Sequence, residues 1–239
     1  MFEKTIIRHK DLEVKVSDHA NEGMIEILSR AVQGSEGGLR FQLKNIPSRI
    51  AAYGDQIRFI SLYRKNKVTG TIGSCYRITG QGKLRYPSSY LRYLAFDSVY
   101  QADISQRKKK VIIKTEKDDS FKKKTLDIFS KPHLLNFKPI GEDEKHIMYA
   151  FVESMNERSK NLIHQLGYEY IRSFLTVAFS RFNPKPDSRV SKISSPEEKE
   201  QVKELLLDYY RDYSLFSTDH ILHGDKYYVL REGGEIVAG

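Results

Sequence analysis

The stretch YLRYLAFDSVYQ, residues Tyr90–Gln101, decides the fold. Its first seven residues, Tyr90–Phe96, are almost all apolar or aromatic, which is typical of a β-strand. A hairpin precedes it, because apolar residues dominate Ile57–Tyr63 and Val68–Ile78 and the polar run Lys65–Lys67 lies between them. The pattern therefore predicts a β-hairpin followed by a further strand.

Alternation of apolar and charged residues predicts a strand at Leu12–Val16. Ser17-Asp18 then offers an N-cap for a helix, and Pro47 suits the first turn of a short second helix over Ile46–Ala52. The apolar face expected for the first helix comprises Met24, Ile25, Ile27, Leu28 and Val32.

Downstream, Phe121–Phe129 is expected to be a helix that ends before Pro132, and His146–Val152 a strand covered on both faces. Asn156–Leu166 is expected to be a helix that ends at Gly167, and Tyr168–Phe182 a final β-rich run. This order of elements predicts a mixed α/β sheet with helices on both faces.

The pattern begins again after a Pro-rich linker at residues 183–188. A strand at Arg189–Ile193 is followed by Ser195, Pro196 and Glu198, a typical helix start, and a hairpin follows around Gly233-Gly234. The expected apolar face of the helix is Val202, Leu205, Leu206 and Tyr209.

Val68-Thr69-Gly70 is similar to Val237-Ala238-Gly239 at an offset of 237 minus 68, or 169 residues. We therefore expect one domain at 1–182, a linker at 183–188, and the start of a second, incomplete repeat at 189–239. On this interpretation the chain is a fragment of a longer protein, since the second copy stops within a strand. The alternative is a coincidental hairpin.

Composition excludes several classes of protein. The 239 residues contain one cysteine, Cys75, which excludes an internal disulfide and a cysteine-based zinc site. The chain has no apolar run of about 18 residues and its N-terminus has no signal-peptide core, so we expect a cytoplasmic protein without membrane contact.

The net charge of +9 is concentrated between Gln106 and Lys131. Such a segment is either a solvated loop or a site for anions, such as nucleic-acid phosphates or a phosphorylated cofactor. Aromatic residues are not interleaved with the basic ones, as a base-stacking surface requires, which disfavours nucleic acid.

Two stretches resemble the GNAT superfamily of acyl-CoA-dependent N-acetyltransferases. Tyr90–Gln101 is similar to the family's pattern L-x-V-D-P-x-Y-(Q/R), and Phe151–Tyr168 to its N-x-x-(A/S)-x-x-x-(Y)-x-x-x-G-(F/Y) segment. The matching residues are Leu94, Phe96, Asp97, Tyr100 and Gln101 in the first, and Asn156, Ser159, Leu166, Gly167 and Tyr168 in the second.

The resemblance implies an α/β (α+β) fold with a mostly antiparallel central sheet, which splays at a bulge in the cofactor strand. It implies that the backbone of Leu94, Ala95 and Phe96, together with Gln101 and Asn156, binds the acetyl-CoA co-substrate and that an amine is the acceptor. Asn156 also suits a helix cap.

The chain departs from the family in the loop for the cofactor pyrophosphate. Ile104 and Gln106 stand where the family has glycines, and Asp103 adds a negative charge. Either Arg107 and Lys108 hold the phosphates by ionic contacts, or this copy has lost acyl-CoA binding.

Catalytic groups are harder to assign. Ile163 stands at the position of the family's usual tyrosine acid, Glu153 is a weak candidate for the general base, and no metal-ligand spacing occurs. The leading hypothesis is an N-acyltransferase that transfers an acetyl group to an amine by direct attack. The alternatives are a non-catalytic GNAT-like lobe for partner binding or regulation, and a basic nucleic-acid-binding protein. If the chain is a fragment, the remaining half of the second repeat is a further expected partner.

Overall fold

The computed structural model describes residues 1–34, 40–80, 85–97, 121–137, 145–173, 185–218, 221–222 and 227–239. The chain divides into two compact units. Unit 1 comprises Met1–Arg77 and Pro87–Glu169, and unit 2 comprises Ile78–Tyr86 and Tyr170–Gly239. Within the described ranges, no helix combines the length and the apolar composition needed to cross a membrane.

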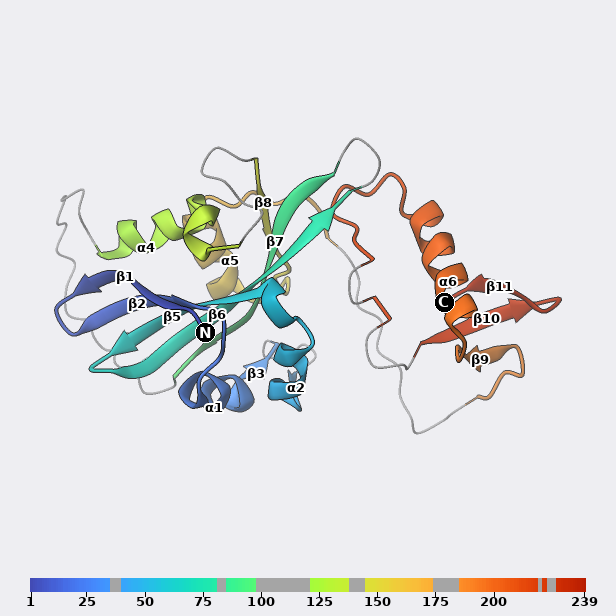
Figure 1. The fold of residues 1–239 in the computed structure, drawn as a ribbon, viewed down its shortest axis with the longest axis horizontal. Helices are drawn as coiled ribbons and strands as arrows, with labels where there is room; N and C mark the ends of the chain where they lie inside the picture. The colour runs from blue at the N-terminus through green and yellow to red at the C-terminus, as the bar shows by residue number, and fades with distance from the viewer. Residues whose placement is uncertain are drawn as a thin grey trace. The chain divides into compact units, whose positions relative to one another are not determined.

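The main sheet has six strands in the order β1-β2-β5-β6-β7-β8 (Figure 1). β1 pairs with β2, β2 with β5 and β5 with β6, each antiparallel, whereas β7 and β8 are parallel. The strands are β1 (Glu3–His9), β2 (Leu12–Ser17), β5 (Ile57–Arg64), β6 (Lys67–Thr79), β7 (Tyr86–Phe96) and β8 (Ile147–Ala150). The predicted mixed and mostly antiparallel sheet is confirmed.

β6 and β7 also run antiparallel. The amide of Asp97 donates to the carbonyl of Thr69 at 2.9 Å, and the hydroxyl of Ser88 donates to the carbonyl of Arg77 at 3.1 Å. These bonds join the end of each strand to the start of the other.

Helices cover both faces of the sheet, as predicted: α1 and α2 lie on one face, and α4 and α5 on the other (Figure 1). Their bounds are α1 (Glu22–Arg30), α2 (Ile46–Ala51), α4 (Phe121–Ser130) and α5 (Glu157–Gln165). Shorter elements are β3 (Val32–Gln33), β4 (Phe41–Gln42) and the 3₁₀ turns η1 (Gly54–Gln56) and η2 (Pro132–Leu135).

Two expectations for α1 are wrong. The N-cap is Asn21, whose side-chain oxygen accepts from the amide of Met24 at 3.0 Å, whereas Ser17 still belongs to β2. β2 extends one residue further than predicted, to Ser17, and α1 therefore begins later in the chain. Val32 lies in β3 and is 51% exposed, because α1 ends at Arg30.

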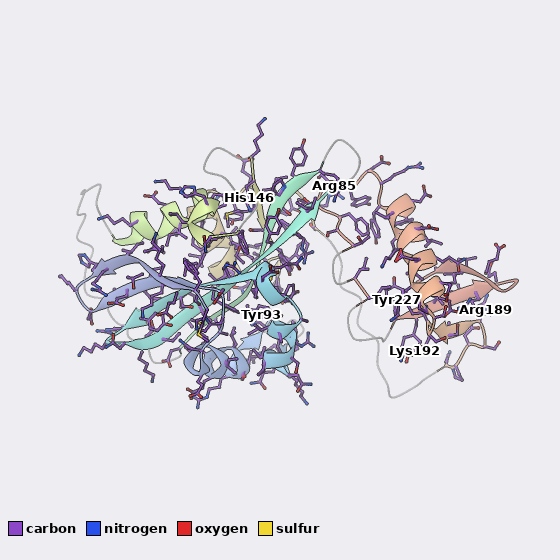
Figure 2. All side chains as sticks on the ribbon, in the orientation of Figure 1. Arg85, Tyr93, His146, Arg189, Lys192 and Tyr227 are labelled. Carbon is purple, nitrogen blue, oxygen red and sulfur yellow. The ribbon has the colours of Figure 1, made fainter. Side chains whose placement is uncertain are left out.

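The second sheet, in unit 2, has three antiparallel strands in the order β11-β10-β9. They are β9 (Val190–Lys192), β10 (Tyr228–Glu232) and β11 (Glu235–Ala238), with α6 (Pro196–Tyr209) between β9 and β10. Figure 2 labels Arg189, Lys192 and Tyr227 in this unit. The predicted helix start is confirmed, because Ser195 and Glu198 form a capping box.

The prediction of the apolar face of α6 is wrong for one residue, Tyr209. Val202 and Leu206 are buried, but Tyr209 is 71% exposed, and Tyr210 packs against this core instead. Leu206 and Tyr210 are four residues apart and therefore share a helical face.

The hairpins β5–β6 and β10–β11 have the same construction. Each turns through two residues with positive φ, Lys65-Asn66 in one and Gly233-Gly234 in the other, as tight two-residue hairpins require. Each also has one register shift, after Leu62 in β5 and after Leu230 in β10.

Superimposing the turns and the register shifts equates Leu62 with Leu230, an offset of 168 residues. Val68 then corresponds to Ile236 rather than to Val237, and both residues are buried. The sequence offset of 169 was therefore one residue too long.

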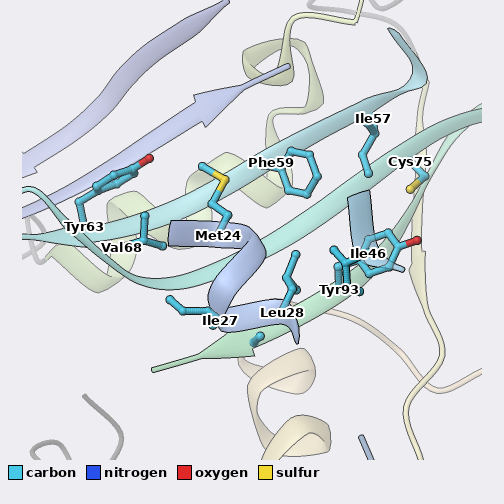
Figure 3. Close-up of a cluster of buried hydrophobic side chains, with 11 residues drawn as sticks. Met24, Ile27, Leu28, Ile46, Ile57, Phe59, Tyr63, Val68, Cys75 and Tyr93 are labelled. Carbon is cyan, nitrogen blue, oxygen red and sulfur yellow. The ribbon is translucent and has the colours of Figure 1, made fainter. Parts of the chain in front are cut away.

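Unit 1 has a core on each face of its sheet. On the α1–α2 side, Met24, Leu28 and Ile46 pack against Phe59 and Tyr93 (Figure 3). On the other side, Ile128 and Leu135 pack against residues of β1, β2, β5, β6 and β7. Burial of such side chains is the main source of stability in a domain of this size.

β8 is shorter than the predicted strand and only partly covered. It spans Ile147–Ala150, and of its residues only Tyr149 is buried, while the following Phe151 is 55% exposed. The apolar run is therefore not a strand covered on both faces. Tyr168–Ser173 forms no strand, and the rest of the predicted β-rich run lies largely outside the described residues.

Candidate functional site

The parallel strands β7 and β8 pair over a short stretch and then part. The paired positions run from Ser88 opposite Ile147 to Leu91 opposite Ala150. β8 ends there, but β7 continues through Phe96. Beyond Leu91, the edge of β7 that faces β8 therefore no longer pairs with β8.

A bulge occurs where the strands part. Tyr93 has φ +58°, a left-handed conformation that a tyrosine rarely adopts, although it lies within β7. The guanidinium carbon of Arg92 lies 4.4 Å from the centre of the Tyr93 ring, so these neighbours project to the same side rather than alternating. The bulge bends β7 at the start of its unpaired stretch.

The predicted cofactor strand follows this bulge directly. Ala95 is buried in the core beside α1 and α2, and Leu94 packs on the opposite core, as strand alternation requires. The ring of Phe96 lies over Gly70, where a Cβ atom would come within 2.5 Å of it. On the β6 side the end of this stretch is held by the bond between Asp97 and Thr69.

Asn156 is the N-cap of α5. Its side-chain oxygen accepts from the amide of Ser159 at 3.0 Å, and its own amide donates to the carbonyl of Glu153 at 3.0 Å. At the other end of the helix Gly167 has φ +82°, the conformation of a C′ glycine. The capping interpretation of Asn156 is confirmed, and its role toward a cofactor stays a prediction.

The other predicted site residues have different positions. Glu153 is partly buried, and it lies in the segment of the chain that joins β8 to α5. Gln101, Arg107 and Lys108 lie outside the described residues. No group of three or more potential metal ligands occurs in the ranges that are described.

The sequence did not predict a cluster of arginines and tyrosines at the same opening. Arg92 donates to the hydroxyl of Tyr53, and its guanidinium carbon lies 5.4 Å from the ring centres of both Tyr53 and Tyr90. Arg77, on β6, lies 5.4 Å from the Tyr90 ring as well. Tyr90 stacks on Tyr149 of β8 with their ring centres 5.3 Å apart.

The one signal for this cluster in the sequence is the charge within otherwise apolar strands. Arg92 interrupts the apolar run of Tyr90–Phe96, and Arg77 lies near the end of β6. Because Tyr53 and β8 are distant in sequence from β6 and β7, only the fold shows that these residues meet.

Cys75 lies beside this cluster and is fully buried. Burial raises the pKa of its thiol to about 12, although Arg92 and Arg77 oppose that change. Since the thiolate is the reactive form, we expect a thiol reagent at pH 8 to leave the folded protein almost unmodified. In urea the same reagent should modify one thiol per chain, and rapid modification of the folded protein would contradict the buried position.

The chain is similar overall to several solved structures of acetyltransferases. An aminoglycoside acetyltransferase from an uncultured soil metagenomic sample is 10% identical, with 71% of this chain and 96% of that chain covered and a TM-score of 0.43. Glucosamine-6-phosphate N-acetyltransferase from Arabidopsis thaliana is 15% identical, with 70% and 99% covered and a TM-score of 0.39. An acetyltransferase of Trypanosoma brucei is 11% identical, with 71% and 100% covered and a TM-score of 0.41.

No protein-family model and no curated protein sequence matches the chain. The solved structures are too distant to indicate a substrate. The fold itself is defined by the strand order, the parallel β7–β8 pair that opens at a bulge, and the helices on both faces. The chain has a mixed α/β fold with a mostly antiparallel central sheet, and it is similar to solved structures of acetyltransferases.

Proposed function

We propose that unit 1 is an acyl-CoA-dependent N-acyltransferase that transfers an acetyl group from acetyl-CoA to an amine. The observation that carries this proposal is the parting of β7 from β8 at the Tyr93 bulge. Beyond it, Leu94–Phe96 offers a strand edge on which the pantetheine arm can add like a further strand, using backbone hydrogen bonds.

The reaction needs little from side chains. The amine nitrogen attacks the thioester carbonyl, the carbon–sulfur bond breaks, and the amine loses one proton as the amide forms. Glu153, between β8 and the start of α5, is the proposed base for that proton, directly or through water. Ile163 cannot protonate the sulfur, so the proposed reaction releases CoA as a thiolate that takes its proton from solvent.

Calorimetric titration of the chain with acetyl-CoA, CoA and pantetheine tests the proposal. Acetyl-CoA is expected to bind with a dissociation constant near the micromolar range, about −8 kcal/mol. Pantetheine lacks the nucleotide, so weak binding of pantetheine reports on the β7 edge alone. Absence of heat with acetyl-CoA at high micromolar concentration would overturn the proposal.

A non-catalytic lobe is the second candidate, favoured by one sequence observation. Ile104 and Gln106 replace the glycines that let a helix N-terminus approach a pyrophosphate. This candidate predicts that CoA, acetyl-CoA and pantetheine all fail to bind. The three titrations therefore separate the two candidates.

We also propose that residues 189–239 are the first half of a second GNAT-like repeat, joined by the linker 183–188 to a first domain at 1–182. The matching turns and register shifts of β5–β6 and β10–β11 support this proposal. So does the burial of Val68 and Ile236 at equivalent positions against a helix.

A further inference from the structure

Two arginines in unit 1, Arg77 and Arg92, carry buried hydrogen-bond donors without acceptors. The Nε atom of each is inaccessible to solvent and has no hydrogen-bond partner. Across the described ranges, no carboxylate forms a salt bridge with either guanidinium. Buried charged donors of this kind are costly unless an acceptor satisfies them.

Their neighbours do not offset the two positive charges. Burial raises the pKa of Tyr93 and Cys75 to about 12, and it raises the pKa of Tyr90 and Tyr149 as well. These groups therefore stay neutral near pH 7. Contacts with ring faces stabilise a guanidinium by about 0.5–2 kcal/mol, but they leave its Nε–H unsatisfied.

Other arginines of the chain are provided with acceptors. Arg58 is buried and its Nε atom also lacks a partner, but its two terminal nitrogens donate to the backbone carbonyls of Asp55, Ile57 and Asn136. Arg231 pairs with Glu198 in unit 2. Arg58 and Arg231 thus donate to carbonyl or carboxylate oxygens, whereas in the described ranges Arg92 donates to a tyrosine hydroxyl and neither Arg77 nor Arg92 pairs with a carboxylate.

The pair lies beside the opening of the strands. Both guanidinium carbons are 5.4 Å from the centre of the same ring, that of Tyr90. Tyr90 is paired in register with Tyr149, and Arg92 is the second residue after it, immediately beyond the last rung at Leu91. Both arginines are partly exposed, so part of each side chain is open to a ligand, although its Nε atom is not in contact with solvent.

We propose that Arg77 and Arg92 bind an oxyanion, a carboxylate or a phosphate, carried by the acceptor amine. Guanidinium groups suit both anions, because their N–H donors match pairs of oxygens. This inference rests on the proposed function, in which the amine is acetylated at the same opening. On this inference the acceptor substrate is an amine that also bears an acidic group.

Binding of the anion can be tested without any reaction. The full chain, labelled with ¹⁵N-arginine, is titrated with inorganic phosphate and separately with acetate at millimolar concentrations. We expect saturable shifts of the Nε–H signals of Arg77 and Arg92, assigned from the variants Arg77→Lys and Arg92→Lys. Arg231, which already has a carboxylate partner, is the internal control. Equal shifts of all arginines, or none, would overturn oxyanion binding.

The link to the acceptor is tested with matched amines. β-Alanine is compared with β-alaninamide, and phosphoethanolamine with ethanolamine, so the pairs separate carboxylate from phosphate. The acidic member of at least one pair is expected to be acetylated about tenfold more efficiently, since a charge-assisted hydrogen bond is worth at least that factor. Arg92→Lys keeps the charge but not the planar fork, and should remove most of the preference.

The outcomes separate the two proposals. If acetyl-CoA binds and neither pair shows a preference, the assignment of the acceptor is wrong and the proposed function stands. If acetyl-CoA does not bind but the Nε–H signals shift, the proposed function is wrong and only the oxyanion site remains. A preference that persists unchanged in Arg77→Lys and Arg92→Lys would place the acidic group elsewhere.

Discussion

Replacing Phe59 by alanine is expected to lower the free energy of unfolding of unit 1 by about 3–5 kcal/mol. Phe59 is fully buried at the centre of the core between the sheet and helices α1 and α2 (Figure 3). Removing its ring leaves a cavity, and the hydrogen-bonded strands β5 and β6 around it cannot move inward to fill it.

The free energy of unfolding is measured by urea titration. Hydrogen exchange is then measured for peptides from β5 and β6. The matched control is Phe41→Ala, because Phe41 is 49% exposed in the short strand β4 and its loss should cost no more than about 0.5 kcal/mol. A loss below about 1 kcal/mol for Phe59→Ala would show that the site is not tightly packed.

Replacing Gly70 by alanine is expected to displace Phe96 and to weaken acetyl-CoA binding. A Cβ atom at Gly70 would come within 2.5 and 2.7 Å of two ring atoms of Phe96, a distance that no real contact tolerates. Gly70 is not one of the described glycines with a positive φ. The expected effect of the substitution is therefore steric rather than conformational. We expect a loss of stability of about 1–3 kcal/mol, and an affinity for acetyl-CoA reduced by roughly tenfold or more.

A double-mutant cycle isolates the cause. In the variant Gly70→Ala/Phe96→Ala the clash is absent, so the second substitution should recover part of the stability lost by the first. Thermal unfolding and calorimetric titration are measured for all four proteins. If the two substitutions are simply additive in both measurements, Gly70 does not act through Phe96.

Local patterns predicted the elements that depend on local interactions. The hairpin at Lys65-Asn66 and the capping box at Ser195 are short-range features, and the structure confirms both. The N-cap of α1 was harder, because Ser17, Asp18 and Asn21 are all good capping residues and the extent of β2 selects among them. Tyr209 and Tyr210 are likewise neighbours, and only tertiary packing decides which one is buried.

The candidate site was predictable in part. Family-like spacing predicted Leu94–Phe96 and Asn156 as candidate residues, and the structure shows that β7 is bulged and leaves β8 just before the first of these stretches. The bulged residue itself was not predictable, since tyrosine has no preference for positive φ. The cluster around Arg92 also needs Tyr53 and Tyr149, which are far from β7 in sequence, and no local pattern reveals such contacts.

Unit 2 is discontinuous, and this has a consequence for synthesis of the protein. Ile78–Tyr86 belongs to unit 2 with Tyr170–Gly239, and the amide of Gly80 donates to the carbonyl of Phe216 at 3.1 Å. At about 5–20 residues per second, the ribosome makes the acceptor on the order of ten seconds after the donor. During that interval Gly80, at the end of β6, lacks its hydrogen-bond partner, so we expect the nascent chain to depend most on chaperones around this residue.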